Sequence, residues 1–385
     1  MDDPSDDREE VYAVDDGAAS MDDDLDEPDD DAPRLVESAL SLRERFRLVR
    51  KIGEGAFGEV HEGLDEASGE RVALKLARLC GVPGNERDDG KSLPKAVLRE
   101  LWCLQELVGE PHATQYLAHF PRGASLALVL EFCAADLQSV MAERDGGAPL
   151  PEAAARRWTR ELLMGLGAVH GAGLMHRDVK PSNCLLTDGG VLKLGDFGQA
   201  RPLVATEGGG DFSHQISTRW YRSPELLFGA RAYTTAIDLW AVGVVLAEIL
   251  HDYVLFEGRS DIEQLLVVFK KMGSPTAERF PSAAATPDFP KICFKAMEPL
   301  PLAEVCPRAD AAALELIGTI LVLEPTRRAT AAEALGARFF EGPDAPRVDL
   351  ATLALSTAAA CDAKRSAQVD SDEEDWNRGG WEGLG

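Results

Sequence analysis

The chain has 385 residues, 45% of them hydrophobic, and a formal net charge of −26 at pH 7. Such a chain is globular and long enough to bury a large core in more than one lobe. Most of the acidity lies at the ends, because residues 1–37 carry a net charge of −15, residues 343–385 carry −5, and the rest carries only −6. No basic stripe is visible in the sequence, which argues against nucleic-acid binding.

Three features predict an intracellular protein without membrane insertion. The seven cysteines are scattered singly, with no metal-ligand spacing, as reduced thiols usually are. The start, MDDPSDDREE, is neither a signal peptide nor a transit peptide. The longest apolar run, from Leu239 to Leu250, has 12 residues and is too short to span a bilayer.

The predicted elements lie between two tails and begin with β-strands. Residues 1–45 are acidic and poor in aromatics, so we expect a disordered tail there. Glycine-punctuated β-rich runs predict two strands joined by a loop within residues 46–65, and another strand over residues 70–79.

A helix, a further strand and then mainly helices follow. Apolar residues at positions 97, 98, 101, 104, 107 and 108 predict a helix that ends at Gly109. Residues 126–132 have the pattern of a buried strand, and from residue 151 the pattern is mainly helical. Residues 342–385 form a second flexible, acidic tail. We therefore expect an α+β protein with a small sheet-rich lobe and a larger helical lobe.

The segment GEGAFGEV carries three glycines, Gly53, Gly55 and Gly58, in a GxGxxG pattern. In dinucleotide-binding folds this pattern joins a strand to a helix. Here the residues that follow, EVHEGLD, resemble a returning strand, which favours a hairpin lying over phosphate groups. Taken alone, the pattern is equally compatible with an ordinary β-turn.

Lys75 ends the apolar strand VALK, so its ammonium is a candidate for a functional group that points into a site. Glu100, on the predicted helix, is the acid that we expect to hold this lysine in an ion pair. The plain alternatives are a surface lysine whose stem covers apolar neighbours, and a solvated glutamate.

The segment HRDVKPSN, residues 176–183, carries the most specific pattern. Asp178 can orient a substrate hydroxyl, Lys180 can neutralise phosphate charge, and Asn183 can offer an oxygen to a divalent cation. The segment DFG, residues 196–198, adds the carboxylate of Asp196 for the metal. Each residue alone could be structural, but phosphoryl transfer needs all these groups, and the four motifs occur in order.

With these motifs in this order, residues 46–341 resemble the eukaryotic protein kinases. The resemblance implies a bilobal fold, with the N-lobe over residues 46–132 and the C-lobe over residues 133–341, that uses ATP and Mg²⁺. It implies that Asp178 and Lys180 are catalytic, that Asn183 and Asp196 bind the metal, and that Asp238 and the Glu225–Arg328 pair are structural. The nucleotide-binding residues that it implies are Ile52, Gly53, Gly55, Gly58, Val60, Ala73, Lys75, Glu100, Glu131, Cys133, Asp136 and Leu185.

Several segments resemble the cyclin-dependent kinases and, among them, the cell-cycle-related kinase subgroup. PKAVLRE, residues 94–100, is similar to the cyclin-facing helix of that family. SHQISTRWYR (213–222), FGARAY (228–233) and DIEQL (261–265) are similar to segments of the subgroup. The resemblance implies a cyclin or cyclin-like activator at the 94–100 helix. It also implies cell-cycle or cilium-related signalling, in the cytoplasm, the nucleus or the cilium.

The resemblance places Ser213 where the family carries its activating phosphothreonine. Arg99, Arg177 and Arg201 match the family's phosphate-binding cluster, so a phosphate on Ser213 would connect three elements. We therefore interpret Ser213 as a switch that an activating kinase sets. The alternative is a plain loop serine.

Two residues match the substrate site of proline-directed kinases. Arg222 matches the arginine that shapes the pocket after the phosphorylated residue, where proline is accepted because it has no N–H. Thr218 matches a residue near the catalytic aspartate of Ser/Thr kinases. The sequence therefore predicts protein substrates with Ser/Thr-Pro sites.

Three departures from the family pattern stand out. Ala56 and Phe57 replace the phosphorylatable pair of the glycine loop, so inhibition by phosphorylation there is excluded. Gly195, before DFG, is small and predicts a larger pocket floor. Ser223 opens a Ser-Pro-Glu segment where the family usually has Ala-Pro-Glu.

Two other functions are compatible with parts of this pattern. A pseudokinase scaffold would bind partners without transferring phosphate, but it would be favoured by the loss of Lys75, Asp178 or Asp196, and all three are present. A small-molecule kinase is disfavoured by the Ser-Pro-Glu segment and Arg222, which belong to a peptide-docking surface.

Overall fold

The structure, a computed structural model, describes residues 39–55, 58–81, 91–123, 125–142, 150–203, 218–251 and 253–341. Ser213 and the Ala56–Phe57 pair lie outside these residues, as do the second predicted tail and most of the first. The described part contains the expected α+β arrangement of a sheet-rich lobe with one main helix and a larger helical lobe, which is thereby confirmed.

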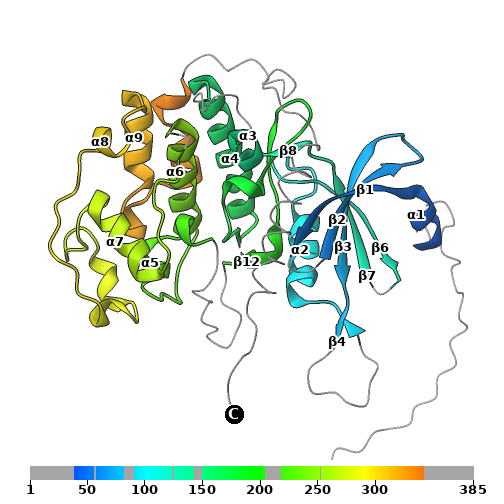
Figure 1. The fold of residues 1–385 in the computed structure, drawn as a ribbon, viewed down its shortest axis with the longest axis horizontal. Coiled ribbons are helices and arrows are strands. Elements are labelled where there is room, and N and C mark those ends of the chain that lie inside the picture. The colour runs from blue at the N-terminus through cyan, green and yellow to red at the C-terminus, as the bar shows by residue number, and fades with distance from the viewer. Residues whose placement is uncertain are drawn as a thin grey trace, which may run out of the picture. The chain divides into compact units, whose positions relative to one another are not determined.

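The N-lobe is built on a five-stranded antiparallel sheet in the order β1-β2-β3-β7-β6 (Figure 1). Its strands are β1 (Phe46–Gly55), β2 (Gly58–Asp65), β3 (Arg71–Arg78), β6 (Tyr116–Arg122) and β7 (Ser125–Glu131). The main helix, α2 (Lys95–Glu106), follows a short ribbon of β4 (Cys80–Gly81) and β5 (Lys91–Ser92).

The structured part of the N-lobe begins earlier than the sequence predicted. Helix α1 (Ala39–Arg45) precedes β1, so residues 39–45 do not belong to the disordered tail. Leu42 packs against the small core around Phe46 and Phe120, and Arg45 makes a two-pronged contact with Asp65 at 2.8 and 2.7 Å. The acidic composition ends before this segment, and apolar contact with the sheet is enough to order it.

Two features of the N-lobe differ from the expectation. Strand β6 was not predicted, because it lies at the sheet edge and buries little, so it lacks an apolar run. In α2, the buried face includes Val97, Glu100 and Leu104, whereas the apolar Leu98 is 54% exposed. The helix therefore presents its acid inward and some apolar side chains outward.

The C-lobe consists of helices and short strands. The helices are α3 (Leu137–Ala142), α4 (Glu152–Gly171), α5 (Pro224–Leu227), α6 (Ala236–His251), α7 (Asp261–Met272), α8 (Leu302–Val305), α9 (Ala311–Ile320) and α10 (Ala331–Leu335). The strands are β8 (Ala135–Asp136), β9 (Leu174–Met175), β10 (Cys184–Leu186), β11 (Leu192–Leu194) and β12 (Arg201–Pro202). Short 3₁₀ turns are η2 (Pro181–Asn183), η3 (Phe197–Gln199), η4 (Arg219–Tyr221), η5 (Pro281–Ala285), η6 (Phe289–Lys291), η7 (Pro325–Arg327) and η8 (Arg338–Phe340).

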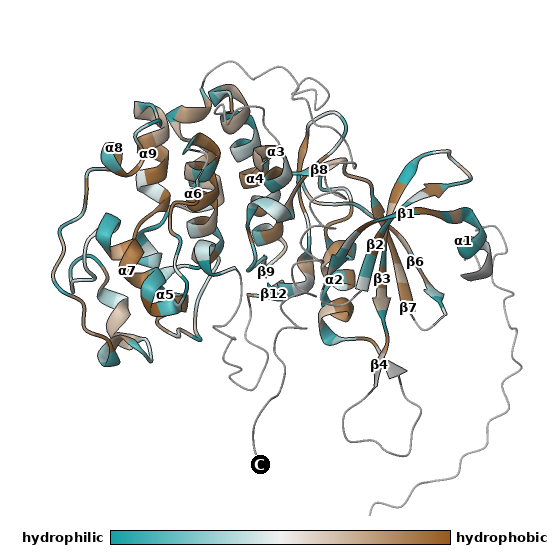
Figure 2. Cartoon of the chain, in the orientation of Figure 1, coloured by the Kyte–Doolittle hydropathy of each residue, from teal (hydrophilic) through white to brown (hydrophobic). Residues whose placement is uncertain are grey.

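Helix α6 is the centre of the C-lobe core. It is buried from Ile237 to His251, and Figure 2 shows it as mainly hydrophobic. At Gly243 a β-carbon would lie 2.7 Å from the side chain of Leu321, which follows α9, so glycine allows the close approach of this neighbour. Among the described residues, no helix combines the length and apolar character needed to cross a membrane.

The last residue of α6, His251, has a buried side chain. It is 2% exposed, and neither ring nitrogen has a hydrogen-bond partner among the described residues. The ring lies 5.6 Å from that of Tyr253. Burial lowers the pKa of His251, and the positive charges of Arg308 and Lys271 lower it further.

This environment predicts acid sensitivity. Below the usual pKa of about 6.5, the unfolded chain binds a proton at His251 that the folded protein does not, so stability falls as the pH falls. We expect the melting temperature of the wild type to drop more between pH 7.5 and 5.5 than that of His251→Phe. The free-energy difference should grow by at most about 1.4 kcal/mol per pH unit. Parallel melting curves for the two proteins would contradict this assignment.

Candidate active site

The catalytic loop, residues 176–183, runs between β9 and β10 and is fastened to α6. The carboxylate of Asp238 accepts hydrogen bonds from the backbone N–H of His176 at 2.9 Å and of Arg177 at 2.7 Å. Arg177 has a φ of 68°, a conformation that non-glycine residues rarely adopt. The two bonds from Asp238 hold the backbone in this conformation, in agreement with the structural role implied for Asp238.

Asp178 is surrounded by polar groups that fix its carboxylate. Lys180 Nζ lies 2.7 Å from Oδ2, and Asn183 Nδ2 donates to the same oxygen at 3.1 Å. The backbone N–H of Thr218 donates to Oδ1 at 3.1 Å. The structure thus brings together the predicted catalytic residues, Asp178 and Lys180, with the predicted metal ligand Asn183 and the substrate-site residue Thr218.

Asp196 begins the DFG segment with a left-handed backbone, at a φ of 59°. The next residue, Phe197, is fully buried, and its ring meets the edge of the His176 ring at 5.0 Å. His176 also contacts the carbonyl oxygen of Gly195 through Nε2 at 3.0 Å. The catalytic loop and the DFG segment therefore share one core contact, which sets the position of Asp196 relative to Asp178.

The predicted ion pair between β3 and α2 is present. Lys75 Nζ lies 2.7 Å from both carboxylate oxygens of Glu100, and 3.4 Å from Oδ1 of Asp196. Burial opposes the charge of Lys75, but the carboxylates of Glu100 and Asp196 outweigh this effect and raise the pKa of the ammonium. Burial also opposes ionisation of Asp196, but Lys75 and other cations lower the pKa of its carboxyl. Lys75 and Asp196 are therefore both charged at neutral pH.

The glycine loop is a hairpin of β1 and β2, as the sequence favoured. Gly55 pairs with Gly58, and Gly53 pairs with Val60. A β-carbon on Gly58 would lie 1.8 Å from the carbonyl oxygen of Leu76, so only glycine fits where β2 begins to pair with β3. Val60 pairs with Lys75 on β3, which places the hairpin beside the ion-paired lysine.

The other predicted nucleotide-binding residues come from both lobes. Ala73 lies on β3 and Ile52 on β1, while Leu185 lies on β10, opposite Asp136 of β8. The carboxylate of Asp136 accepts hydrogen bonds from the N–H and the hydroxyl of Ser139, at 2.9 and 2.8 Å. It thus holds the start of α3, and its contact with a bound nucleotide stays a prediction.

The segment that connects the lobes contains Glu131 and Cys133. Burial raises the pKa of the Cys133 thiol to about 12, which supports the interpretation of this residue as a small apolar side chain. The expectation that Gly195 enlarges the pocket floor is wrong. A β-carbon on Gly195 would lie 2.7 Å from Cδ1 of Leu185 and 3.0 Å from Oγ1 of Thr114, so these side chains already fill the space.

The three arginines of the predicted phosphate-binding cluster come from α2, the catalytic loop and β12. Burial lowers the pKa of Arg99, and the positive charge of Arg201 lowers it further. Burial likewise lowers the pKa of Arg177, which Arg201 and Arg99 also influence. Arg177 donates to the carbonyl oxygen of Gln199 at 2.8 Å and to the hydroxyl of Tyr233 at 2.7 Å. The positive charge of Arg201 thus acts on both Arg99 and Arg177. Ser213 itself lies outside the described residues.

The predicted substrate-site residue Arg222 is buried beside α7. Its Nη1 donates to the carboxylate of Asp261 at 3.1 Å, and Arg219 Nε donates to the same oxygen at 2.8 Å. The sequence did not single out Asp261, because a lone acid at the start of a helix is usually solvated. It positions both arginines beside Thr218.

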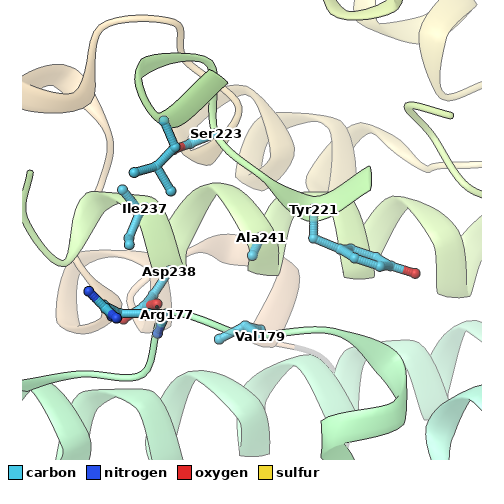
Figure 3. A pocket seen from close by; sticks show the side chains of 8 residues that line it. Arg177, Val179, Tyr221, Ser223, Ile237, Asp238 and Ala241 are labelled. Carbon is cyan, nitrogen blue, oxygen red and sulfur yellow. Dashed lines mark hydrogen bonds between the residues drawn. The ribbon is translucent and has the colours of Figure 1, made fainter. Parts of the chain in front are cut away.

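Between the catalytic loop, α6 and the segment from Tyr221 to Leu226 lies a small cavity of about 10 Å³ (Figure 3). Arg177, Tyr221, Ser223 and Asp238 are among its lining residues. The hydroxyl of Ser223 is buried and has no hydrogen-bond partner among the described residues. The serine that departs from the family pattern therefore places an unsatisfied polar group in the interior.

We expect Ser223→Ala to stabilise the protein by about 1 kcal/mol, because it removes a buried hydroxyl that has no partner. The measurement is the melting temperature, which should rise. Ser139→Ala is the matched control, because it removes a hydroxyl that donates to Asp136, and its melting temperature should fall. If Ser223→Ala also melts lower, the hydroxyl has a partner that the described residues do not reveal.

A further ion pair fixes the segment between the lobes and was not predicted. Lys193 on β11 is buried, and its Nζ lies 2.7 Å from the carboxylate of Glu131. The sequence feature that could have indicated this ion pair is a lysine between two apolar residues in LKL, a position where an uncompensated charge is costly. The partner could not be read from the sequence, because it lies on a different lobe.

The arrangement can hold a nucleotide with a divalent cation. Asn183 uses Nδ2 for both of its bonds to Asp178, so its amide oxygen is the atom suited to a cation. Asp196 adds a charged carboxylate, and hard oxygen ligands of this kind fit Mg²⁺. No group of three or more His, Cys, Asp or Glu gathers as a metal site within the described residues. An ion held by Asn183 and Asp196 would complete its shell with water and phosphate oxygens.

Comparison with known proteins agrees with this geometry. The model of the protein kinase domain matches residues 46–340. Cyclin-dependent kinase 20 of Mus musculus is 40% identical over 297 residues, which cover 77% of this chain and 83% of that protein. Cyclin-dependent kinase 7 of Xenopus laevis is 36% identical over 315 residues, covering 81% of this chain and 86% of that protein.

A solved structure is also similar. It is a chain of the CAK complex from Chaetomium thermophilum bound to ATP-γ-S, with 30% sequence identity and a TM-score of 0.71. The match covers 80% of this chain and 94% of that one. The motifs, the two-lobed fold and these matches agree, and the chain belongs to the protein kinase family, with cyclin-dependent kinases as its relatives.

Proposed function

We propose that this protein is a serine/threonine kinase that transfers the γ-phosphate of Mg-ATP to Ser/Thr-Pro sites of proteins. The observation that carries the proposal is the geometry of two clusters of polar and charged side chains, one around Lys75 and one around Asp178. Lys75 is ion-paired with Glu100 and lies 3.4 Å from Asp196, while Asp178 is held by Lys180, Asn183 and Thr218. The proposal is supported by these contacts, which involve the kinds of side chain that phosphoryl transfer uses.

In this proposal each residue has a separate task. Lys75 binds the α- and β-phosphates, and Glu100 keeps its ammonium in place. Asp178 accepts a hydrogen bond from the substrate hydroxyl and orients its oxygen, while Lys180 stabilises charge on the transferred phosphate. Mg²⁺, held by Asn183 and Asp196, would neutralise phosphate charge when bound. Catalysis is then positioning together with electrostatic stabilisation.

The preference for proline rests on Arg222 and Thr218. Arg222 is buried and oriented by Asp261, next to the segment that contacts Asp178 through Thr218. A proline after the phosphorylated residue has no N–H that would need a partner in this pocket. A substrate residue with an N–H would have to leave it unsatisfied, which lowers its affinity.

An activator of the cyclin class would bind the outer face of α2. Leu98 and Trp102 lie one helical turn apart, and they are 54% and 41% exposed. Two large apolar side chains on the surface of the helix that carries Glu100 are suited to a partner that fixes this helix. The relatives are named as cyclin-dependent kinases, which supports the same class of partner.

Activation by phosphorylation of Ser213 is part of the same proposal. Arg99, Arg177 and Arg201 carry positive charges that influence one another. A phosphate on Ser213 would relieve this repulsion and join α2, the catalytic loop and β12. The cellular role in cell-cycle or cilium-related signalling, and the compartment in cytoplasm, nucleus or cilium, stay predictions.

The test is phosphate transfer from Mg-ATP to two peptides that differ only in Ser-Pro against Ser-Ala. We expect the Ser-Pro peptide to be labelled selectively, and Lys75→Met to abolish the labelling. The assay is repeated with Ser213→Glu and with candidate cyclins. If no protein or peptide is labelled under any of these conditions, while folded protein is present, a scaffold that binds partners replaces the kinase.

A further inference from the structure

A second ion pair crosses between the lobes near the segment that connects them. Arg71, the first residue of β3, donates through Nη2 to both carboxylate oxygens of Asp188 at 2.7 Å. The two residues are 117 positions apart in the chain. Asp188 lies in the turn between β10 and β11, so the pair joins the N-lobe sheet directly to the C-lobe.

The same arginine contacts the connecting segment itself. The guanidinium of Arg71 lies over the ring of Phe132 at 4.3 Å, a distance at which a cation is attracted to an aromatic face. Phe132 follows Glu131, which is ion-paired with Lys193 at 2.7 Å. A backbone bond from Ala134 to the carbonyl oxygen of Leu186, at 2.8 Å, continues these contacts. The connecting segment is therefore held by contacts at Glu131, Phe132 and Ala134.

The position of Arg71 on β3 relates it to the nucleotide site. Arg71, Ala73 and Lys75 alternate with the buried Val72 and Leu74, so the three share the face of the strand that Lys75 presents to Asp196 of the C-lobe. Lys75 lies 3.4 Å from Asp196 of the C-lobe at one end of this row. Arg71 meets Asp188 at the other end, about 13 Å away at the usual rise of a strand.

The partner, Asp188, is also connected through the backbone to the predicted nucleotide site. It lies in the turn that joins β10, which follows Asn183 and carries Leu185, to β11, which leads to Asp196. Thr187 and Val191 close this turn with a backbone hydrogen bond of 3.0 Å. A displacement of the turn would therefore be passed along both strands to the predicted nucleotide-binding and metal residues.

We infer that Arg71 and Asp188 are positioning residues that set the spacing of the two lobes at the adenine end of the nucleotide site. The inference rests on the proposed use of ATP. Lys75 and Asp196 join the lobes at the phosphate end, and Arg71 and Asp188 join them at the opposite end. With both ends joined, the slot for the nucleotide is formed before binding, so less free energy is lost in ordering it.

The effect on affinity is limited by exposure. The side chains of Arg71 and Asp188 are 45% and 67% exposed, and exposed pairs contribute little because solvent and salt screen them. When the pair is lost, a fraction of the molecules has its lobes too far apart at this end, and apparent affinity falls by that fraction. The expected loss of ATP affinity is about two- to five-fold.

The experiment measures Mg-ATP binding by calorimetry for the wild type, Arg71→Ala and Asp188→Ala, and for the exchange Arg71→Asp with Asp188→Arg. Peptide phosphorylation is measured in parallel. We expect each single variant to raise Kd and the KM for ATP two- to five-fold with kcat unchanged, because neither residue touches the reacting atoms. The exchanged pair should restore both values. The difference from wild type should shrink in 0.5 M salt.

Arg279→Ala is the matched control. Arg279 is 33% exposed and pairs with Glu298 at 2.9 Å, but both residues lie in the C-lobe. Its ATP affinity should equal that of the wild type. Melting temperatures of all variants are compared, so that a fold defect is recognised.

The outcomes separate this inference from the proposed function. If the wild type binds no Mg-ATP, the proposed function fails and the inference fails with it. If the wild type binds but the single variants bind equally well, only the inference is overturned. The same conclusion follows if the exchanged pair stays as weak as the single variants, or if Arg279→Ala is equally weakened.

Discussion

Asp178→Asn should lower the rate of peptide phosphorylation by about 10²- to 10⁴-fold while leaving ATP affinity close to that of the wild type. Asparagine keeps the size of the side chain, but it loses the negative charge that pairs with Lys180 at 2.7 Å and accepts a hydrogen bond from Asn183 at 3.1 Å. The amide is a weaker acceptor for the substrate hydroxyl, so the attacking oxygen is less well oriented. Lys75 and Glu100, which the proposal assigns to nucleotide binding, are unaffected.

The measurement is the initial rate on a Ser-Pro peptide at saturating ATP, with ATP affinity determined separately. Asp310→Asn is the control, because Asp310 caps α9 through a bond of 2.7 Å from the N–H of Ala313, and asparagine also caps helices. The control should keep full activity. A loss below ten-fold for Asp178→Asn, at unchanged ATP affinity, would show that Asp178 does not act on the substrate hydroxyl.

Arg328→Ala should destabilise the fold by about 3–5 kcal/mol, because it leaves a buried carboxylate without its partner. Arg328 Nη1 and Nη2 lie 2.6 and 2.7 Å from the two carboxylate oxygens of Glu225, and both side chains are almost completely buried. The guanidinium also lies over the ring of Trp240 at 5.0 Å and donates to three backbone carbonyl oxygens. One substitution therefore removes the partners of several buried groups.

Thermal unfolding checks this expectation, with Arg328→Lys as a milder variant if the alanine protein does not fold. Arg338→Ala is the matched control, because Arg338 and Glu315 form a pair at 3.4 Å in which both side chains are about 60% exposed. Its melting temperature should stay close to that of the wild type. Equal melting temperatures for Arg328→Ala and Arg338→Ala would mean that burial does not govern the strength of the Glu225–Arg328 pair.

The residues that were readable from the sequence are those whose chemistry is local. Gly58 must be glycine because β2 passes close to Leu76, and Asp178 and Asn183 lie five residues apart in one loop. The pairing of Lys75 with Glu100 could be anticipated because each is part of a recognisable motif, and the structure contains that pair.

The features that the sequence did not reveal depend on tertiary contacts. Nothing in the neighbourhood of Arg71 indicates Asp188, 117 residues later, and nothing near Lys193 indicates Glu131. The outward direction of Leu98 was missed because the buried face of α2 follows the sheet, and periodicity alone does not say which apolar residues that face includes. The misjudged room at Gly195 has the same origin, since Leu185 comes from another strand.

The hydrogen bonds that Asp238 accepts from the backbone of the catalytic loop have a consequence for genetic variation. The loop has an unfavourable backbone at Arg177, and its shape is maintained from α6, a helix whose other residues are almost all apolar and buried. A substitution that shifts α6 by a fraction of an ångström, such as one that enlarges Gly243 against Leu321, would be transmitted to the segment that holds Asp178. Inherited changes deep in the C-lobe can therefore alter the geometry around Asp178 while the polypeptide remains folded.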